Sequence, residues 1–224
     1  MVSRDNGEER RYHTRVGRGS QRPQAARALP GGVQRHRQPR VPGVNELIRP
    51  VEKASDIPAH LRGTPLQELL EYHNLERELV PVAAPRLLIG MCMDNRKHLR
   101  IPDNFAFILR AGGANLRPSE FKVSYAIAVG GVRALAIIGH TNCGMVNLMS
   151  RSHAFIEGLV TNAGWDRQQA EEHFFHFAPL FEIGSEIDFT RSEAKRLRMR
   201  YPGVVVAPML YKVEDSRLYL LGES

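Results

Sequence analysis

Two short apolar segments constrain the fold of this chain more than any other feature. Leu87–Met91 (LLIGM) and Ala134–Gly139 (ALAIIG) are apolar runs with the length of buried strands. Chemically active side chains follow each run at once, in Cys92-Met93-Asp94-Asn95-Arg96 and in His140-Thr141-Asn142-Cys143-Gly144. Because strands of parallel sheets are covered on both faces, such runs are typical of them.

The remaining segments alternate between strand and helix patterns. Further strands are predicted at about Phe105–Arg110, Val204–Tyr211 and Arg217–Leu221. Helices are predicted at Pro65–Leu79, Pro118–Val129, Cys143–Arg151, Trp165–Phe177 and Phe189–Arg200. This alternation predicts a single α/β domain with a mostly parallel central β-sheet flanked by helices. Ligands of such sheets bind beyond the carboxyl ends of the strands, where both polar motifs fall.

Local patterns also predict how some of these elements are capped and packed. Thr64 is the expected N-cap of the first helix, and Thr190 or Ser192 that of the last. The segment Phe105–Arg110 (FAFILR) indicates a buried strand. In the helix that follows it, the expected packing positions are Phe121, Tyr125, Ile127 and Ala128.

The basic charge of the chain is confined to its first 43 residues. The chain has 31 lysines and arginines and 24 aspartates and glutamates, a formal net charge of +7. Residues 1–43 hold ten arginines, no lysine and three acids, so the other residues carry 21 charges of each sign. Since a nucleic-acid-binding domain carries its own basic face, we expect the domain to bind no nucleic acid.

Residues 1–43 are rich in Arg, Gly, Gln and Pro and lack apolar periodicity, so they are predicted to be a disordered basic tail ahead of a domain at 44–224. Three interpretations of this tail stay open. It is a dispensable extension or upstream coding sequence, an arm for nucleic acid or a membrane surface, or an organellar transit peptide. The three acids and the lack of amphipathic spacing disfavour a transit peptide.

Cysteine usage and the lack of long apolar runs indicate the compartment. No run has the length needed to span a membrane, and no apolar signal segment is present at the N-terminus. The two cysteines allow one disulfide, but without an export signal a reducing compartment is favoured. We therefore expect a cytoplasmic protein that binds no membrane and uses its thiols in metal binding or catalysis.

Cys92, His140 and Cys143 are the candidate metal ligands, in the spacing Cys-x47-His-x2-Cys. Two thiolates and one imidazole are the ligand set of a catalytic zinc with an open fourth position. In a first alternative, the thiols are small buried hydrophobes beside a core histidine. In a second, Cys143 is a nucleophile assisted by His140. The position of the residues at the ends of two strands favours the metal.

Asp94 and Arg96 lie just beyond the first cysteine, where an ionisable pair can act on whatever fills the open metal position. The alternative is a surface ion pair, which contributes little free energy. The place of the pair next to a metal ligand at a strand end favours a catalytic role.

These motifs resemble those of the β-class carbonic anhydrases. CMDNR and HTNCGM resemble the Cys-x-Asp-Ser/Ala-Arg and His-x-x-Cys-Gly motifs of that family, and RAGGAN (Arg110–Asn115) resembles its Arg-Asn-Ala-Gly segment. Ser192–Leu221 resembles the closing helix and strands, so the similarity spans about residues 86–221. Three departures are Asn95 for a small Ser or Ala, Ala111-Gly112 for Asn-Ala, and the lack of a clear match to a pocket glutamine.

The resemblance implies a zinc enzyme, usually dimeric, that reversibly hydrates carbon dioxide to bicarbonate by a zinc-bound hydroxide. It assigns Cys92, His140 and Cys143 to Zn²⁺ and makes Asp94 and Arg96 the catalytic pair. Asp94 would accept a hydrogen bond from the hydroxide, and Arg96 would hold Asp94 by a bidentate contact. The expected partners are CO₂ or bicarbonate and further copies of the chain, as a homodimer or a larger homo-oligomer.

Two alternatives keep the same ligands. A related zinc hydrolase for COS or CS₂ would differ in its pocket walls, and a silent protein would bind zinc or bicarbonate without catalysis. In the catalytic interpretation, the helix expected to start at Cys143-Gly144 would offer main-chain N–H groups to an anionic product.

Overall fold

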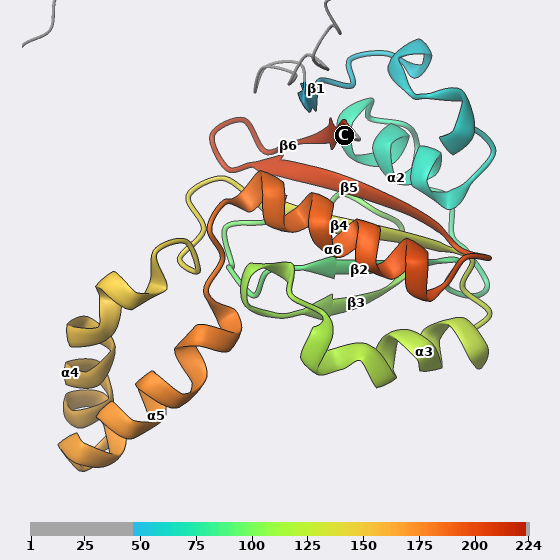
Figure 1. The fold of residues 1–224 in the computed structure, drawn as a ribbon. Helices are drawn as coiled ribbons and strands as arrows, with labels where there is room; N and C mark the ends of the chain where they lie inside the picture. Colours follow the sequence, from blue (N-terminus) through green and yellow to red (C-terminus); the bar gives the residue numbers. More distant parts are fainter. Residues whose placement is uncertain (1–46, 223–224) are drawn as a thin grey trace, which may run out of the picture. The chain divides into compact units, whose positions relative to one another are not determined.

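A six-stranded, mostly parallel sheet runs through residues 47–222, the part of the chain that the computed structural model describes (Figure 1). Across the sheet the strand order is β1-β6-β5-β4-β2-β3. Neighbours from β5 to β3 are parallel, whereas β6 is antiparallel to both β5 and β1. The strands are β1 Ile48–Arg49, β2 Leu87–Met91, β3 Ala106–Arg110, β4 Ala134–His140, β5 Val205–Lys212 and β6 Arg217–Leu221. The predicted α/β fold is confirmed.

Five α-helices occur within the described residues. They are α2 Pro65–Asn74, α3 Glu120–Ala128, α4 Ser152–Ala163, α5 Arg167–Phe181 and α6 Glu186–Arg200. In Figure 1, α6 lies across β4 and β5, while α4 and α5 pack on each other and extend away from the sheet. No helix among residues 47–222 is long and apolar enough to cross a lipid bilayer. The predicted tail and the boundary near residue 44 lie outside the described residues.

Apolar side chains on both faces of β2 and β4 form the core. Both strands are buried at every position, which explains their continuous apolar sequences. Ile89 and Ile138 pack with the leucines of α2 on one face, and Leu88 and Ile137 pack with α3 and α6 on the other. The two central strands are therefore fixed between two layers of helices.

The first and last helices differ from the sequence expectation at their ends. Thr64 caps α2 as predicted, accepting a hydrogen bond from the main-chain N–H of Leu66 at 3.2 Å. The helix ends at Asn74 and not at Leu79, because Glu76 adopts a left-handed backbone (φ 56°). Helix α6 begins earlier than predicted, since its N-cap is Ser185.

The predicted burial holds only in part for the predicted strand Phe105–Arg110, where Phe105 is buried and Phe107 and Leu109 pack partly exposed against the core, and it is mostly wrong for α3. Within residues 47–222, β3 is an edge strand that pairs with β2 alone, and Ile108 is 43% exposed. On α3 the buried residues are Val123 and Ala126, whereas Phe121 is 81% exposed and Tyr125 is 54% exposed. Of the four expected packing positions, only Ile127 contacts the core.

No α-helix begins at Cys143, so that prediction is also wrong. Residues 141–147 form turns after β4. A short 3₁₀ helix at Leu148–Arg151 then leads into α4, which the sequence did not predict. Helix α5 extends four residues beyond the predicted end, to Phe181.

Candidate metal centre

The pairing of β2 with β4 places the two polar motifs at one edge of the sheet. Met91 and Ile138 are register partners in a parallel ladder, so Cys92 and His140 lie at the same ends of neighbouring strands. The turn after β4 then returns Cys143 to this point, with Asn142 in the left-handed region (φ 56°). The ligand atoms of Cys92, His140 and Cys143 all lie within 4.8 Å of one another.

The two cysteines are buried free thiols. Their Sγ atoms are 4.0 Å apart and share a hydrogen bond. This bond lowers the pKa of Cys92 and raises the pKa of Cys143, so the pair loses its first proton readily and holds the second. Since thiolates are the form that binds metals, a bound cation would favour loss of the second proton as well.

One ring nitrogen of His140 is hydrogen-bonded, and the other has no hydrogen-bond partner among the described residues. Nδ1 lies 2.9 Å from the carbonyl oxygen of Thr141, which can only accept, so this nitrogen carries the proton. Nε2 is therefore the lone-pair nitrogen, and it is buried without a hydrogen-bond partner among residues 47–222. A main-chain carbonyl on the far nitrogen is the usual support of a metal-binding histidine. The donor set and this unpaired nitrogen fit a zinc ion.

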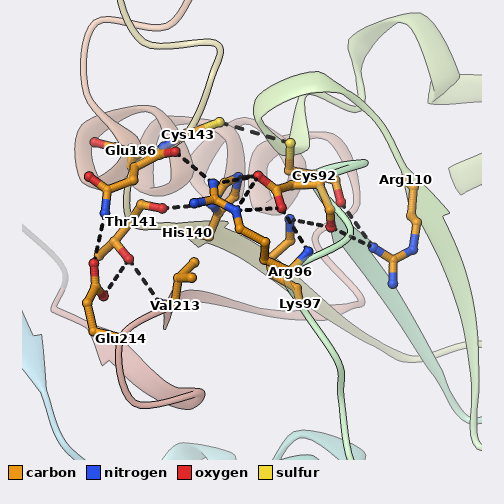
Figure 2. Close-up of polar contacts among 12 residues, drawn as sticks. Cys92, Arg96, Lys97, Arg110, His140, Thr141, Cys143, Glu186, Val213 and Glu214 are labelled. Carbon is orange, nitrogen blue, oxygen red and sulfur yellow. Dashed lines mark hydrogen bonds and ion pairs between the residues drawn. The ribbon is translucent and has the colours of Figure 1, made fainter.

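Arg96, which Figure 2 shows near Cys92 and His140, forms a bidentate ion pair with Asp94. Arg96 Nε donates to Asp94 Oδ1 at 3.0 Å and Nη2 to Oδ2 at 2.6 Å, and the Arg96 main-chain N–H adds a bond at 2.9 Å. These contacts hold the pKa of the Asp94 carboxyl well below its usual range. Asp94 Oδ2 lies 4.0 Å from His140 Nε2, so the carboxylate borders the position that a metal would occupy.

Residues distant in sequence support the turn that carries Cys143. Glu214 accepts hydrogen bonds from Thr141 Oγ1 at 2.7 Å and from Asn142 Nδ2 at 2.9 Å. Glu186, at the start of α6, accepts from the Cys143 main-chain N–H at 3.2 Å. That N–H is therefore bound to a carboxylate, and the expected helix start that would bind an anionic product does not exist. No sequence motif around either glutamate predicts that it binds the turn that carries Cys143.

Two basic side chains bind the main chain between Cys92 and Asp94. Arg110 of β3 donates to the carbonyl oxygens of Cys92 at 3.3 Å and Asp94 at 3.4 Å. Lys97, labelled in Figure 2, donates from Nζ to the same Asp94 carbonyl at 3.1 Å. Its side chain is fully buried. The RAGGAN resemblance included Arg110, whereas nothing in the sequence singled out Lys97.

An apolar pocket of about 280 Å³ lies next to the thiols. Met145 lines this pocket and also packs against the cluster formed by Cys92, Cys143 and Ile183. Met93 lines it from the other motif, and aromatic side chains of α4 and α5 complete its walls. The pocket therefore offers an apolar environment beside the candidate centre.

Comparison with solved structures finds similarity to several carbonic anhydrases and to a carbon disulfide hydrolase. The carbonic anhydrase from Glaciozyma antarctica is 22% identical over 61% of this chain and 83% of that chain, with a TM-score of 0.48. The Streptococcus mutans enzyme is 18% identical over 70% and 95%, with a TM-score of 0.49. A carbon disulfide hydrolase is 20% identical over 65% and 82%, with a TM-score of 0.46. Neither a scan against protein-family models nor a search of curated proteins finds a match.

The purified protein should bind about one zinc ion per chain, because three ligand atoms converge at the strand ends. Cys143→Ala should lose most of this zinc, whereas Ser150→Ala, a change on the neighbouring 3₁₀ helix, should retain it. Elemental analysis after exhaustive dialysis measures both. Zinc retention by Cys143→Ala would show that the ion is bound elsewhere.

Proposed function

We propose that this protein is a zinc-dependent enzyme that reversibly hydrates carbon dioxide to bicarbonate. The observation that carries the proposal is the unpaired Nε2 of His140 within reach of two buried thiols, with the Asp94–Arg96 pair alongside. The motif resemblance to β-carbonic anhydrases supports it independently. A zinc ion held by Cys92, His140 and Cys143 would supply a Lewis acid that activates water near neutral pH.

The chain's own residues would orient the reacting water. Asp94 Oδ2 can accept a hydrogen bond from a water molecule at the open position, because it lies 4.0 Å from His140 Nε2. Arg96 keeps that carboxylate ionised and fixed through its two side-chain hydrogen bonds. Arg96 Nη2 also donates to the carbonyl oxygen of Asn142 at 3.0 Å, so it ties the two strand ends together.

The apolar pocket supports a small neutral substrate. Carbon dioxide has no charge and would enter such a pocket without losing strong hydration. The same walls suit COS and CS₂, so a zinc hydrolase for these molecules is the second candidate. Parallel assays of CO₂ hydration and of COS and CS₂ consumption on zinc-loaded protein distinguish the two candidates, and failure of all three would indicate a silent binding protein.

Asp94→Asn should keep zinc and lose about 100-fold or more in CO₂ hydration, since the amide removes the anionic acceptor. Arg96→Ala should also lose activity, and its profile should move to alkaline pH because the released Asp94 can itself occupy the open position. Stopped-flow measurement with a pH indicator tests both variants.

The control variants make the same types of substitution, Asp to Asn and Arg to Ala, at exposed sites. Asp103→Asn and Arg133→Ala change exposed residues outside the candidate centre and should retain wild-type rates. Full activity of Arg96→Ala at neutral pH would remove the orienting role from the pair and leave only the metal assignment.

We further propose that the protein is a homo-oligomer in which a second copy covers β3 and α3. One edge of β3 pairs with no other strand in the described part of the chain, and the exposed Phe121, Tyr125 and Ile108 lie on β3 and α3. Natural proteins usually cover such edges and patches. Phe121→Glu should shift the mass in sedimentation to that of the monomer, whereas Phe175→Glu on α5 should not. A monomeric wild-type protein would contradict the proposal.

The proposed activity is placed in residues 44–224, because residues 1–43 carry the excess charge and no apolar pattern. A protein shortened to begin at Val44 should therefore fold and hydrate CO₂ at the rate of the full chain. Circular dichroism and the same stopped-flow assay test this. Loss of activity in a folded, zinc-loaded shortened protein would give the tail a role in the mechanism.

A further inference from the structure

Lys97 is a buried lysine that has no carboxylate partner among the residues the structure describes. Its side chain is 0% exposed, although lysines are almost never fully buried unless they are paired. The contact that holds its Nζ is the Asp94 carbonyl oxygen at 3.1 Å, and no ion pair joins it to an acid within residues 47–222. A neutral residue of similar shape would fill this space at a lower cost of desolvation. The buried ammonium therefore needs another explanation.

The charges near Lys97 belong to the candidate metal centre. Burial is the largest influence on its pKa and lowers it, and the neighbouring cation Arg110 acts in the same direction. The negative charges of Cys92, Asp94 and Cys143 oppose this and raise it. The contact of Lys97 Nζ with the Asp94 carbonyl oxygen thus places the ammonium beside the main chain that joins the ligand Cys92 to Asp94.

The charges of the zinc-loaded centre show what Lys97 would add. Two thiolates offset the charge of Zn²⁺, and Arg96 offsets Asp94 through the ion pair. An anion at the open position would then leave one negative charge uncompensated inside the protein. Arg110 is an exposed residue, so water screens its charge, whereas the ammonium of Lys97 is shielded from water and acts more strongly.

We propose that Lys97 is a positioning residue of this centre, which holds the Asp94 main chain in place and supplies the positive charge that stabilises an anion at the open metal position. The inference rests on the proposed function, because it requires zinc at Cys92, His140 and Cys143. It extends that function by naming the residue that sets the anion affinity of the site. It also gives the buried ammonium a purpose that packing alone does not.

Three variants separate charge from contact. Lys97→Met removes both the charge and the hydrogen bond, Lys97→Gln removes the charge but keeps an N–H donor, and Lys97→Arg keeps the charge. Lys195→Met removes an exposed lysine on α6 as the matched control. Each protein is loaded with Co²⁺ in place of zinc, and its visible spectrum is followed during titration with thiocyanate and with pH.

Lys97→Met and Lys97→Gln should bind thiocyanate with an affinity lower by about tenfold or more, because one buried positive charge is lost. For the same reason, the pH midpoint of the change in their visible spectra should lie about one unit higher than in the wild type. Lys97→Arg should recover most of both effects, and Lys195→Met should match wild type. Metal content and thermal unfolding confirm that each variant is loaded and folded. If Lys97→Met fails to fold, the comparison of Lys97→Gln with Lys97→Arg carries the same test.

Wild-type anion affinity and midpoint in loaded Lys97→Gln would overturn the inference. A wild-type protein that takes up neither zinc nor cobalt would overturn the proposed function and this inference together. A loaded wild-type protein that binds thiocyanate but hydrates no CO₂ would overturn only the proposed function, and the effect of Lys97 on the anion would then support the inference by itself.

Discussion

The parallel pairing of β2 with β4 is the constraint on which the candidate centre depends. Both strands are buried on both faces, and their register brings Cys92 and His140 to the same edge. On one face of the sheet, neighbouring side chains approach the glycines of β2 and β4 closely, which helps to fix this arrangement. A Cβ at Gly90 would lie 2.6 Å from Leu116 Cδ1, and one at Gly139 would lie 2.2 Å from Thr190 Oγ1. Helix α6 can therefore approach β4 closely, and its first residue, Glu186, reaches the Cys143 main chain.

Around this scaffold, polar side chains are paired with one another at short range. Arg96 binds Asp94, Glu214 binds the turn after β4, and the two thiols share a hydrogen bond. The lone-pair nitrogen of His140 is an exception, because it is buried without a hydrogen-bond partner among the described residues. The ammonium of Lys97 has a main-chain acceptor, the Asp94 carbonyl oxygen, but no acidic partner among those residues. Since an unpaired buried polar group is costly, the His140 nitrogen marks the place where a bound cation would supply the missing partner.

Sequence reasoning located the strands and the convergent site residues but not their surroundings. β2 and β4 are buried on both faces, so their continuous apolar sequences predict them directly. The polar motifs come directly after these strands in the sequence, so their meeting at one edge of the sheet could also be predicted. The exposure of Ile108 could not be predicted, because an edge strand and a central strand have similar compositions. The exposure of Phe121 on α3 could not be predicted either, because an apolar residue in a helical pattern does not show which face packs on the sheet. Lys97, Glu186 and Glu214 reach the centre through tertiary packing, and Lys97 follows charged neighbours that are typical of a surface. The roles of the candidate ligands and of Asp94 and Arg96 stay predictions.

X-ray absorption at the zinc edge tests the central claim most directly, because it reports the atoms around the metal without relying on activity. The zinc-loaded protein should show two sulfur ligands at about 2.3 Å and one imidazole nitrogen at about 2.0 Å, with a fourth light-atom ligand. His140→Ala should remove the imidazole signal. A zinc coordinated without sulfur, or with an unchanged imidazole signal in that variant, would contradict the account.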